Sequence, residues 1–387
     1  MFRSFCLIAV VLTFGAVAFS QSGRRSAPTP TPTPRSESPE NYSESKPSAK
    51  RPPRVYTVQP TASPTDKTAT AAEPATAASD SEDTIKVDTS LITIPVSVFD
   101  RNGLYIPNLQ QTDFKIFEDG VEQQIAYFAT SDKPFSVVLM LDTSPSTAYR
   151  IEEIRAGAKA FVDQLKANDR VMVVEFDGSI KVRCEFTNDR SAIFKGIDKA
   201  NFGNGTSIYD AVDRTLKRYL QGVEGRKAIV LFTDGVDTTS SKATFDSTLS
   251  YAEELDAMIF PIYYNTFREN LAASQQWPGG GGILGGILGG GQRAGAGRTA
   301  GEYAVGKKYV DSLAEYTGGR VFIPEQTPGG LTRAFEGIAE ELRRQYSIGY
   351  VPESDAKAGQ RRQLKVRVNR PNLLVRSRDS YVVGTSK

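Results

Sequence analysis

The residues with the clearest chemical potential lie in the segment Asp142-Thr143-Ser144-Pro145-Ser146. Its acidic and hydroxyl side chains alternate, so in an extended turn three oxygens can converge on one point. Two later loops, Gly203–Ser207 and Leu231–Gly235, also carry oxygen donors and glycines. Carboxylate and hydroxyl oxygens are the ligands that Mg²⁺, Mn²⁺ and Ca²⁺ prefer. The sequence therefore favours a site for an oxygen-ligated divalent cation.

The elements that would position these loops alternate between strands and helices. Residues 135–141 and 228–232 are continuous apolar runs, as expected of strands buried on both faces. Helical periodicity is found in residues 151–165, 208–220, 245–255, 303–316 and 331–344. This alternation predicts an α/β domain with a mostly parallel central sheet. In such sheets ligands bind beyond the carboxyl ends of the strands, which is where Asp142 and Asp234 are expected to lie.

Missing residue types narrow the chemistry. The 387-residue chain has no histidine, which excludes Ser-His-Asp and Cys-His catalysis and histidine-ligated zinc. Its two cysteines, Cys6 and Cys184, exclude zinc clusters and redox CxxC pairs. We expect a protein without enzymatic activity. The less favoured alternative is a hydrolase that uses a bound metal with an Asp or Glu base.

The charge distribution gives no reason to expect a nucleic-acid partner. The formal net charge is +2, which is close to neutral for a chain of this length. The basic residues of segment 361–370 alternate with apolar ones, which favours a solvated strand face. Binding of an acidic cell-surface polymer by this segment remains open.

The N-terminal region has the composition of an exported protein. Arg3 precedes the apolar stretch Cys6–Ala18, and small residues precede a cleavage point before Gln21. Residues 1–20 are therefore predicted to be a signal peptide, with an uncleaved N-terminal anchor as the alternative. Residues 21–82, rich in Pro, Ser, Thr and Ala, are predicted to form a disordered linker. The mature protein would then be periplasmic, cell-surface or secreted, without a membrane span.

Short strands flank the α/β region on both sides. In residues 83–132, Phe114–Gly120 is a strand pattern ending in an Asp-Gly turn, and Gln124–Phe128 is predicted to pair back onto it as a hairpin. Residues 345–387 contain further strand patterns. The simplest arrangement joins both groups in one small β-sandwich, into which the α/β domain of residues 133–344 is inserted.

A glycine-rich stretch interrupts the α/β pattern. Residues 275–300 include Pro278–Gly282 and further glycine runs. A backbone without side chains is difficult to hold in one conformation, so we predict a mobile loop here. No Gly-Lys-Ser/Thr follows these glycines, so a phosphate-binding loop is not expected.

These features resemble the metal-ion-dependent adhesion site (MIDAS) of von Willebrand factor A (VWA) domains. That site has the pattern Asp-x-Ser-x-Ser, a distant Thr and a later Asp. The positions that match it, and that the resemblance implies as metal ligands, are Asp142, Ser144, Ser146, Thr206 and Asp234. The resemblance covers residues 135–340 and implies a Rossmann-like VWA fold. The flanking segments resemble exported VWA-related proteins of acidobacteria, which implies a bacterial cell envelope as the setting.

The resemblance also implies a function. In such domains the cation, Mg²⁺ or else Mn²⁺ or Ca²⁺, keeps a position that an Asp or Glu carboxylate of a partner protein can occupy. We therefore expect an exported, metal-ion-dependent protein-binding or adhesion module. The alternative is a structural envelope or assembly component in which the ion is only a structural staple.

Several polar residues have simpler interpretations. Thr206 could merely cap the helix that follows it, and Asp234-Gly235 could be only a turn. Asp210 is expected to brace its loop rather than to bind metal. Two other loop carboxylates, Asp177 and Asp237, are expected to be solvated.

Overall fold

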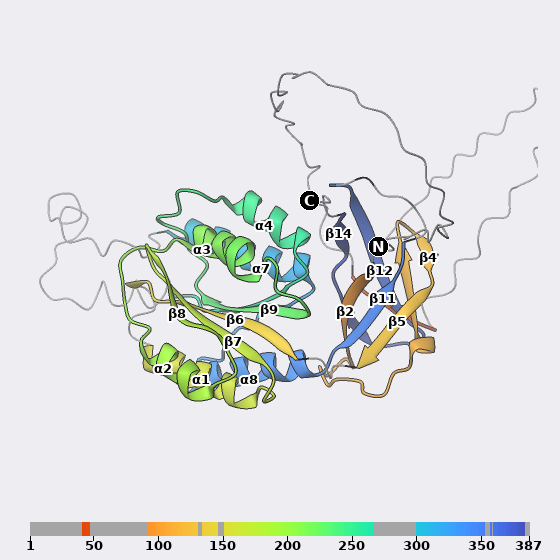
Figure 1. The fold of residues 1–387 in the computed structure, drawn as a ribbon, viewed down its shortest axis with the longest axis horizontal. Coiled ribbons are helices and arrows are strands. Elements are labelled where there is room, and N and C mark those ends of the chain that lie inside the picture. The colour runs from red at the N-terminus through yellow and green to blue at the C-terminus, as the bar shows by residue number, and fades with distance from the viewer. Residues whose placement is uncertain are drawn as a thin grey trace, which may run out of the picture. The chain divides into compact units, whose positions relative to one another are not determined.

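The computed structural model describes residues 41–46, 91–130, 134–145, 151–266, 299–352, 357 and 359–383. The predicted signal peptide, most of the predicted linker and nearly all of the predicted glycine-rich loop lie outside these residues. The described residues form an α/β domain and a β-sandwich (Figure 1). No helix within the described ranges is both long enough and apolar enough to span a bilayer.

A five-stranded sheet forms the centre of the α/β domain, in the order β10-β9-β6-β7-β8. The strands are β6 (Phe135–Asp142), β7 (Arg170–Phe176), β8 (Ile180–Thr187), β9 (Arg226–Thr233) and β10 (Met258–Tyr263). All pairings are parallel except that of the edge strand β8 with β7. The middle strand β6 is buried along its whole length, which explains why it is apolar apart from Ser136 and the terminal Asp142. The predicted mostly parallel sheet is confirmed.

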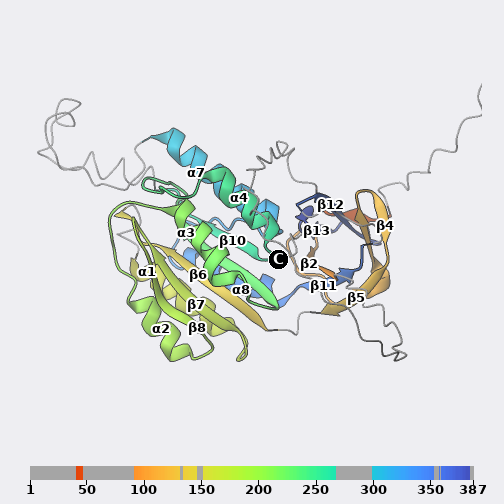
Figure 2. The same ribbon diagram turned by 45° about the horizontal axis from the view of Figure 1, so that its top comes forward.

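Helices cover both faces of this sheet, as Figures 1 and 2 show. One face carries α1 (Ile151–Gln164), α2 (Arg190–Asp198) and α8 (Gly330–Arg343). The other carries α3 (Ile208–Arg214), its π-helical continuation Thr215–Leu220, α4 (Phe245–Glu254) and α7 (Ala300–Thr317). Apolar side chains therefore fill two cores, one on each face of the sheet. The sequence prediction missed only α2 among these helices, because this short helix buries few apolar residues.

The flanking strands form a sandwich of two antiparallel sheets. One sheet has the order β1-β12-β3-β4, with β14 also paired to β12, and the other has the order β13-β2-β11-β5. The strands before the α/β domain are β1 (Ser43–Glu44), β2 (Ile92–Phe99), β3 (Phe114–Glu118), β4 (Val121–Gln123) and β5 (Ile125–Thr130). Those after it are β11 (Tyr346–Tyr350), β12 (Arg361–Val368), β13 (Leu374–Arg376) and β14 (Ser380–Val382).

The α/β domain is inserted into this sandwich, as predicted. Strand β5 precedes the domain and β11 follows it, and the two strands pair with each other. The chain therefore enters and leaves the α/β domain from neighbouring strands of one sheet. Apolar residues from both sheets, including Ile94, Ile116 and Val366, form the sandwich core.

The predicted hairpin between Phe114–Gly120 and Gln124–Phe128 is wrong. The Asp119-Gly120 turn leads into the short strand β4, and β5 joins the opposite sheet beside β11. Asp119 and Gly120 have φ of 47° and 87°, the left-handed values of a tight hairpin turn. The turn was therefore placed correctly. Alternation along β5 indicates a strand but does not specify the sheet that it joins.

A short piece of the segment expected to be a disordered linker is ordered. Ser43–Glu44 pairs with β12 as strand β1. The Val366 N–H donates to the buried Ser45 Oγ at 3.0 Å, and the Arg367 guanidinium donates to Glu44 at 2.9 Å. Hydroxyls and a carboxylate hold this strand in place of apolar side chains. That is why hydrophobic periodicity gave no sign of it.

The polar residues of β12 are exposed or half-exposed and alternate with buried apolar ones, as expected of a solvated strand face, and the basic residues of segment 361–370 are also paired within the chain. The ion pairs are Arg361–Glu253, Arg362–Asp119, Lys365–Glu44, Arg367–Glu44 and Arg370–Asp113. Four carboxylates thus offset most of the five positive charges that an acidic polymer would need. The observation therefore argues against polymer binding by this strand.

Candidate metal centre

Two of the predicted site residues, Asp142 and Asp234, lie at the ends of neighbouring strands at the carboxyl edge of the central sheet. Asp142 is the last residue of β6, Asp234 comes directly after β9, and these two strands are neighbours. Ser144 lies two residues beyond Asp142, and Thr206 lies in the loop that precedes α3. Ser146 lies outside the described residues.

Asp142 is fully buried and accepts hydrogen bonds on both carboxylate oxygens. The Ser144 N–H donates to Oδ1 at 3.0 Å, and Thr233 Oγ1 donates to Oδ2 at 2.7 Å. The Gly235 N–H in turn donates to Thr233 Oγ1 at 2.9 Å. A threonine hydroxyl has one proton. Because Thr233 Oγ1 accepts from the Gly235 N–H, its own proton is free to be donated to Asp142.

Asp234 is buried in a tight turn and also accepts on both oxygens. The Val236 N–H donates to Oδ1 at 3.1 Å, and Thr266 Oγ1 donates to Oδ2 at 2.9 Å. Gly235 has a φ of 78°, and a Cβ there would lie 2.6 Å from the carbonyl oxygen of Gly306 in α7. Asp234-Gly235 therefore does form a turn, as in the simpler interpretation of these residues. The same turn also brings the buried carboxylate of Asp234 to the edge of the sheet.

The loop that carries Thr206 is fixed to the ends of two strands. The Gly203 N–H donates to the Thr143 carbonyl at 3.2 Å, and the Ser207 N–H donates to the Asp177 carbonyl at 2.8 Å. Thr206 is buried, and the N-cap of α3 is Ser207. The interpretation of Thr206 as the cap of this helix is therefore wrong.

Asp210 braces a neighbouring loop, as predicted. Its carboxylate accepts from three successive backbone N–H groups, those of Ser241 at 3.1 Å, Lys242 at 3.0 Å and Ala243 at 2.7 Å. Burial acts to raise the pKa of Asp210, but these hydrogen bonds outweigh it and the pKa is lowered. Asp210 thus supports the loop that follows Asp234 and its turn.

The expectation that Asp177 is solvated is wrong, and Asp237 is only partly exposed. Asp177 is buried, accepts from the Ser179 N–H at 2.6 Å and pairs with Lys181 at 3.2 Å. Asp237 accepts hydrogen bonds from the Ser240 side chain and backbone N–H. Gly203 packs directly against Asp177, because a Cβ at position 203 would lie 1.6 Å from Asp177 Oδ2. The glycine at this position is therefore the sequence signal for the burial of Asp177.

The electrostatics of the site fit a cation. Burial and the nearby charge of Asp234 raise the pKa of Asp142 to about 7, although hydrogen bonds from Ser144 and Thr233 act in the opposite direction. Within the described ranges no three acidic, cysteine or histidine side chains form a cluster. A metal held here would therefore depend on hydroxyl oxygens as well as on two carboxylates. That oxygen donor set suits Mg²⁺, Mn²⁺ or Ca²⁺.

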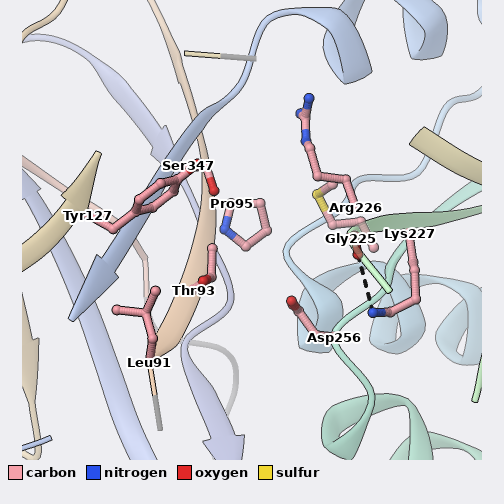
Figure 3. A pocket seen from close by; sticks show the side chains of 10 residues that line it. Leu91, Thr93, Pro95, Tyr127, Gly225, Arg226, Lys227, Asp256 and Ser347 are labelled. Atoms are coloured by element: carbon pink, nitrogen blue, oxygen red, sulfur yellow. Dashed lines mark hydrogen bonds between the residues drawn. The ribbon is translucent and has the colours of Figure 1, made fainter. Parts of the chain in front are cut away.

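A second cavity lies away from this edge (Figure 3). It has a volume of 280 Å³ and is lined by sandwich residues such as Thr93 and Tyr127 and by Lys227 and Asp256 of the α/β domain. Lys227 donates to the Gly225 carbonyl at 3.3 Å. These α/β residues lie at or just before the amino ends of β9 and β10, opposite to the edge at which such sheets bind ligands. The carboxyl edge is therefore the stronger candidate.

Comparison with known proteins bears on the α/β domain. Residues 137–236 match the family described as von Willebrand factor type A domain. An uncharacterized protein of Synechocystis sp. is 31% identical over 106 residues, which are 26% of this chain and 25% of the relative. The chain thus matches about a quarter of the length of this curated relative.

Solved structures show similarity at low sequence identity. A von Willebrand factor type A structure from Catenulispora acidiphila is 14% identical, covers 73% of this chain and 76% of its own, and has a TM-score of 0.40. The vWF domain of the type V pili tip protein Mfa5 from Porphyromonas gingivalis is 22% identical, covers 27% and 39%, and has a TM-score of 0.26. The family match and the mostly parallel sheet identify the domain. The α/β domain of this chain is a von Willebrand factor type A domain.

Proposed function

We propose that the protein is an exported, metal-ion-dependent protein-binding or adhesion module. One divalent cation, Mg²⁺ or else Mn²⁺ or Ca²⁺, would be held by Asp142, Ser144, Ser146, Thr206 and Asp234. The observation that carries this proposal is the buried pair of carboxylates, Asp142 and Asp234, at the carboxyl edge of the sheet. Two like charges buried together are unfavourable unless a proton or a cation neutralises part of the charge, and a divalent cation does so while both carboxylates stay ionised.

The chemistry of the donor set points to binding rather than to catalysis. Two carboxylates and a few hydroxyls leave a divalent ion with positions that water or another oxygen ligand can occupy. An Asp or Glu carboxylate of a partner protein is such a ligand. The chain has no histidine to act as a general base, so we propose no hydrolytic activity.

One observation favours a second candidate, a structural ion in an envelope or assembly component. Asp142, Ser144, Thr206 and Asp234 are each at most 1% exposed. An ion enclosed by these side chains and saturated by protein oxygens would stabilise the domain without contacting a partner.

Calorimetric titration with MgCl₂ and MnCl₂ tests the metal site. The wild type should bind one ion, and Asp142→Ala should abolish binding. Asp198→Ala is the matched control, because Asp198 is an exposed carboxylate at the end of α2 that pairs with Lys159 at 2.6 Å. The absence of binding by the wild type would overturn the proposal.

Water-proton relaxation of the Mn²⁺-loaded protein separates the two candidates. A binding module keeps exchangeable water on the ion, so relaxation should be enhanced and should fall when glutarate, a small dicarboxylate, is added. A saturated structural ion would give little enhancement and no response to glutarate.

Export is a further part of the proposal. The predicted signal peptide lies outside the described residues, so its support comes from the sequence. N-terminal sequencing of the full chain expressed in a bacterium should give Gln21 as the first residue of the exported protein. An intact Met1 would favour the N-terminal anchor.

A further inference from the structure

We propose that Thr266 and Tyr303 are positioning residues for the candidate metal site, acting through Asp234. Thr266 lies three residues beyond the end of β10, and Tyr303 lies in the first turn of α7. Neither residue belongs to the motif that predicted the site. This inference rests on the proposed metal binding and adds a support that the motif does not contain.

The three side chains form a short buried chain of hydrogen bonds. Thr266 Oγ1 lies 2.9 Å from Asp234 Oδ2 and 2.9 Å from the Tyr303 hydroxyl. Thr266, Tyr303 and Asp234 are 0%, 2% and 1% exposed, so bulk water does not compete with these bonds. Both distances are within the normal range for O–H···O hydrogen bonds.

The direction of the chain follows from the number of protons. An ionised carboxylate can only accept, so the Thr266 hydroxyl donates to Asp234. That hydroxyl has one proton, so Tyr303 must donate to Thr266. In a medium of low dielectric constant each bond polarises the next, which strengthens the hold on the carboxylate. In this chain of hydrogen bonds Tyr303 therefore acts on Asp234 through Thr266.

The support of Asp142 follows the same pattern, which argues for a positioning role. There the Gly235 N–H donates to Thr233, and Thr233 donates to Asp142 Oδ2. Each carboxylate thus has a threonine whose proton is directed at it by a second donor. Such hydrogen bonds fix the orientation of both carboxylates, as they do for metal ligands in proteins.

The close packing of α7 holds Tyr303 in place. A Cβ on Gly306, one turn further along α7, would lie 2.6 Å from the backbone of Gly235. The helix therefore contacts the Asp234-Gly235 turn directly. Its first turn cannot move away from Asp234 without breaking this contact.

Calorimetric titration with MgCl₂ of single and double variants tests the proposal. Thr266→Val keeps the shape but removes the donor, and Mg²⁺ affinity should fall by about 10- to 100-fold, the usual range for supporting residues. Thr266→Ser restores a hydroxyl and should restore most of the affinity. Tyr303→Phe should cause a smaller fall. The double variant should bind no more weakly than Thr266→Val, because the tyrosine acts through the threonine.

A matched control pair joins the same helix, α7, to α4. The Tyr309 hydroxyl donates to Thr248 Oγ1 at 2.9 Å, and both residues are fully buried. Thr248→Val and Tyr309→Phe therefore remove a buried hydrogen bond of the same kind, with no hydrogen bond to Asp142 or Asp234. These variants should lower the melting temperature but leave Mg²⁺ affinity unchanged.

The outcomes distinguish this inference from the proposed function. If the wild type binds no Mg²⁺, the metal proposal fails and the positioning role fails with it. If the wild type binds Mg²⁺ but Thr266→Val binds as tightly, only the positioning role is overturned. An equal loss of affinity in Thr248→Val would also overturn it. Circular dichroism of each variant establishes that it is folded. If Thr266→Val is not folded, Tyr303→Phe supplies the test, and an unchanged Mg²⁺ affinity in Tyr303→Phe would overturn the positioning role.

Discussion

Replacing Asp142 by asparagine should have opposite effects on stability with and without Mg²⁺. In the metal-free protein Asp142 is fully buried, and burial together with Asp234 raises its pKa from 3.8 to about 7. An acid whose pKa is raised by folding destabilises the fold as pH rises from the unfolded to the folded value. At pH 8 the ionised carboxylate therefore lowers the free energy of unfolding, and replacing it by the uncharged asparagine removes this loss.

The magnitude follows from the pKa difference and from the hydrogen bonds. Raising the pKa from 3.8 to about 7 corresponds to about 4 kcal/mol at about 1.4 kcal/mol per pKa unit. Against this, an asparagine amide facing Thr233 leaves the threonine proton without an acceptor, which costs about 1–3 kcal/mol. The net gain of about 1–3 kcal/mol should raise the metal-free melting temperature at pH 8 by roughly 5 °C.

Adding Mg²⁺ should reverse the order of stability. At a free Mg²⁺ concentration of about 100 times the dissociation constant, the wild type gains about 2.7 kcal/mol, whereas Asp142→Asn gains little. Thermal unfolding followed by circular dichroism in EDTA and in MgCl₂ measures both effects, with Asp198→Asn as the control. At pH 5 the advantage of Asp142→Asn in EDTA should shrink, because Asp142 is then protonated. A lower melting temperature for Asp142→Asn in EDTA at pH 8 would refute the electrostatic reasoning.

Three further predictions concern the supports of the site and of the domain. Gly205→Ala should destabilise the protein more than Gly222→Ala, because both glycines have similar φ (78° and 81°) but only a Cβ at 205 meets a neighbour, Thr239 Cγ2 at 2.8 Å. Denaturant unfolding measures this, and equal losses would contradict the steric argument. Asp210→Asn should lower stability at pH 7 but much less at pH 3, because the lowered pKa of Asp210 contributes stability only above the unfolded pKa. Urea unfolding at the two pH values tests the sign, and equal losses would argue against it. Glu253→Gln should reduce stability by about 2 kcal/mol, because this buried carboxylate accepts from Arg361 at 2.7 Å and Ser380 at 2.6 Å. The exposed pair of Glu325 and Arg333 is the control, and Glu325→Gln should change stability little in the same assay.

The sequence was most informative where the pattern of apolar residues along a segment indicates which of its side chains are buried. The almost entirely apolar run of β6 indicates burial on both faces, and the periodicity of α1 and α8 indicates helices with one apolar face. Together these patterns predicted the parallel sheet and therefore the edge at which Asp142 and Asp234 meet. The same reasoning could not reveal β1, because hydroxyls and a carboxylate hold this short strand.

Pairing between distant segments was harder to predict. The pattern of β5 indicates a strand, but the choice between β3 and β11 as its neighbour depends on how the whole sandwich closes. Asp177 was expected to be solvated because the sequence shows no clear set of partners for its carboxylate. Its burial beneath the loop of Gly203 arises only when that loop folds over the end of β7.

By itself, the sequence determined the elements of this protein, their order and the carboxylates that meet at one edge of the sheet. Hydrophobic periodicity specifies which face of an element is buried, and parallel strands place their carboxyl ends together. The tertiary structure alone decided which hydroxyls support those carboxylates. Thr266 and Tyr303 are far from Asp234 along the chain, and their contact depends on the close approach of α7 to the Asp234-Gly235 turn. Hydrogen bonds are short and directional, so such partners become evident only when the backbone is in place.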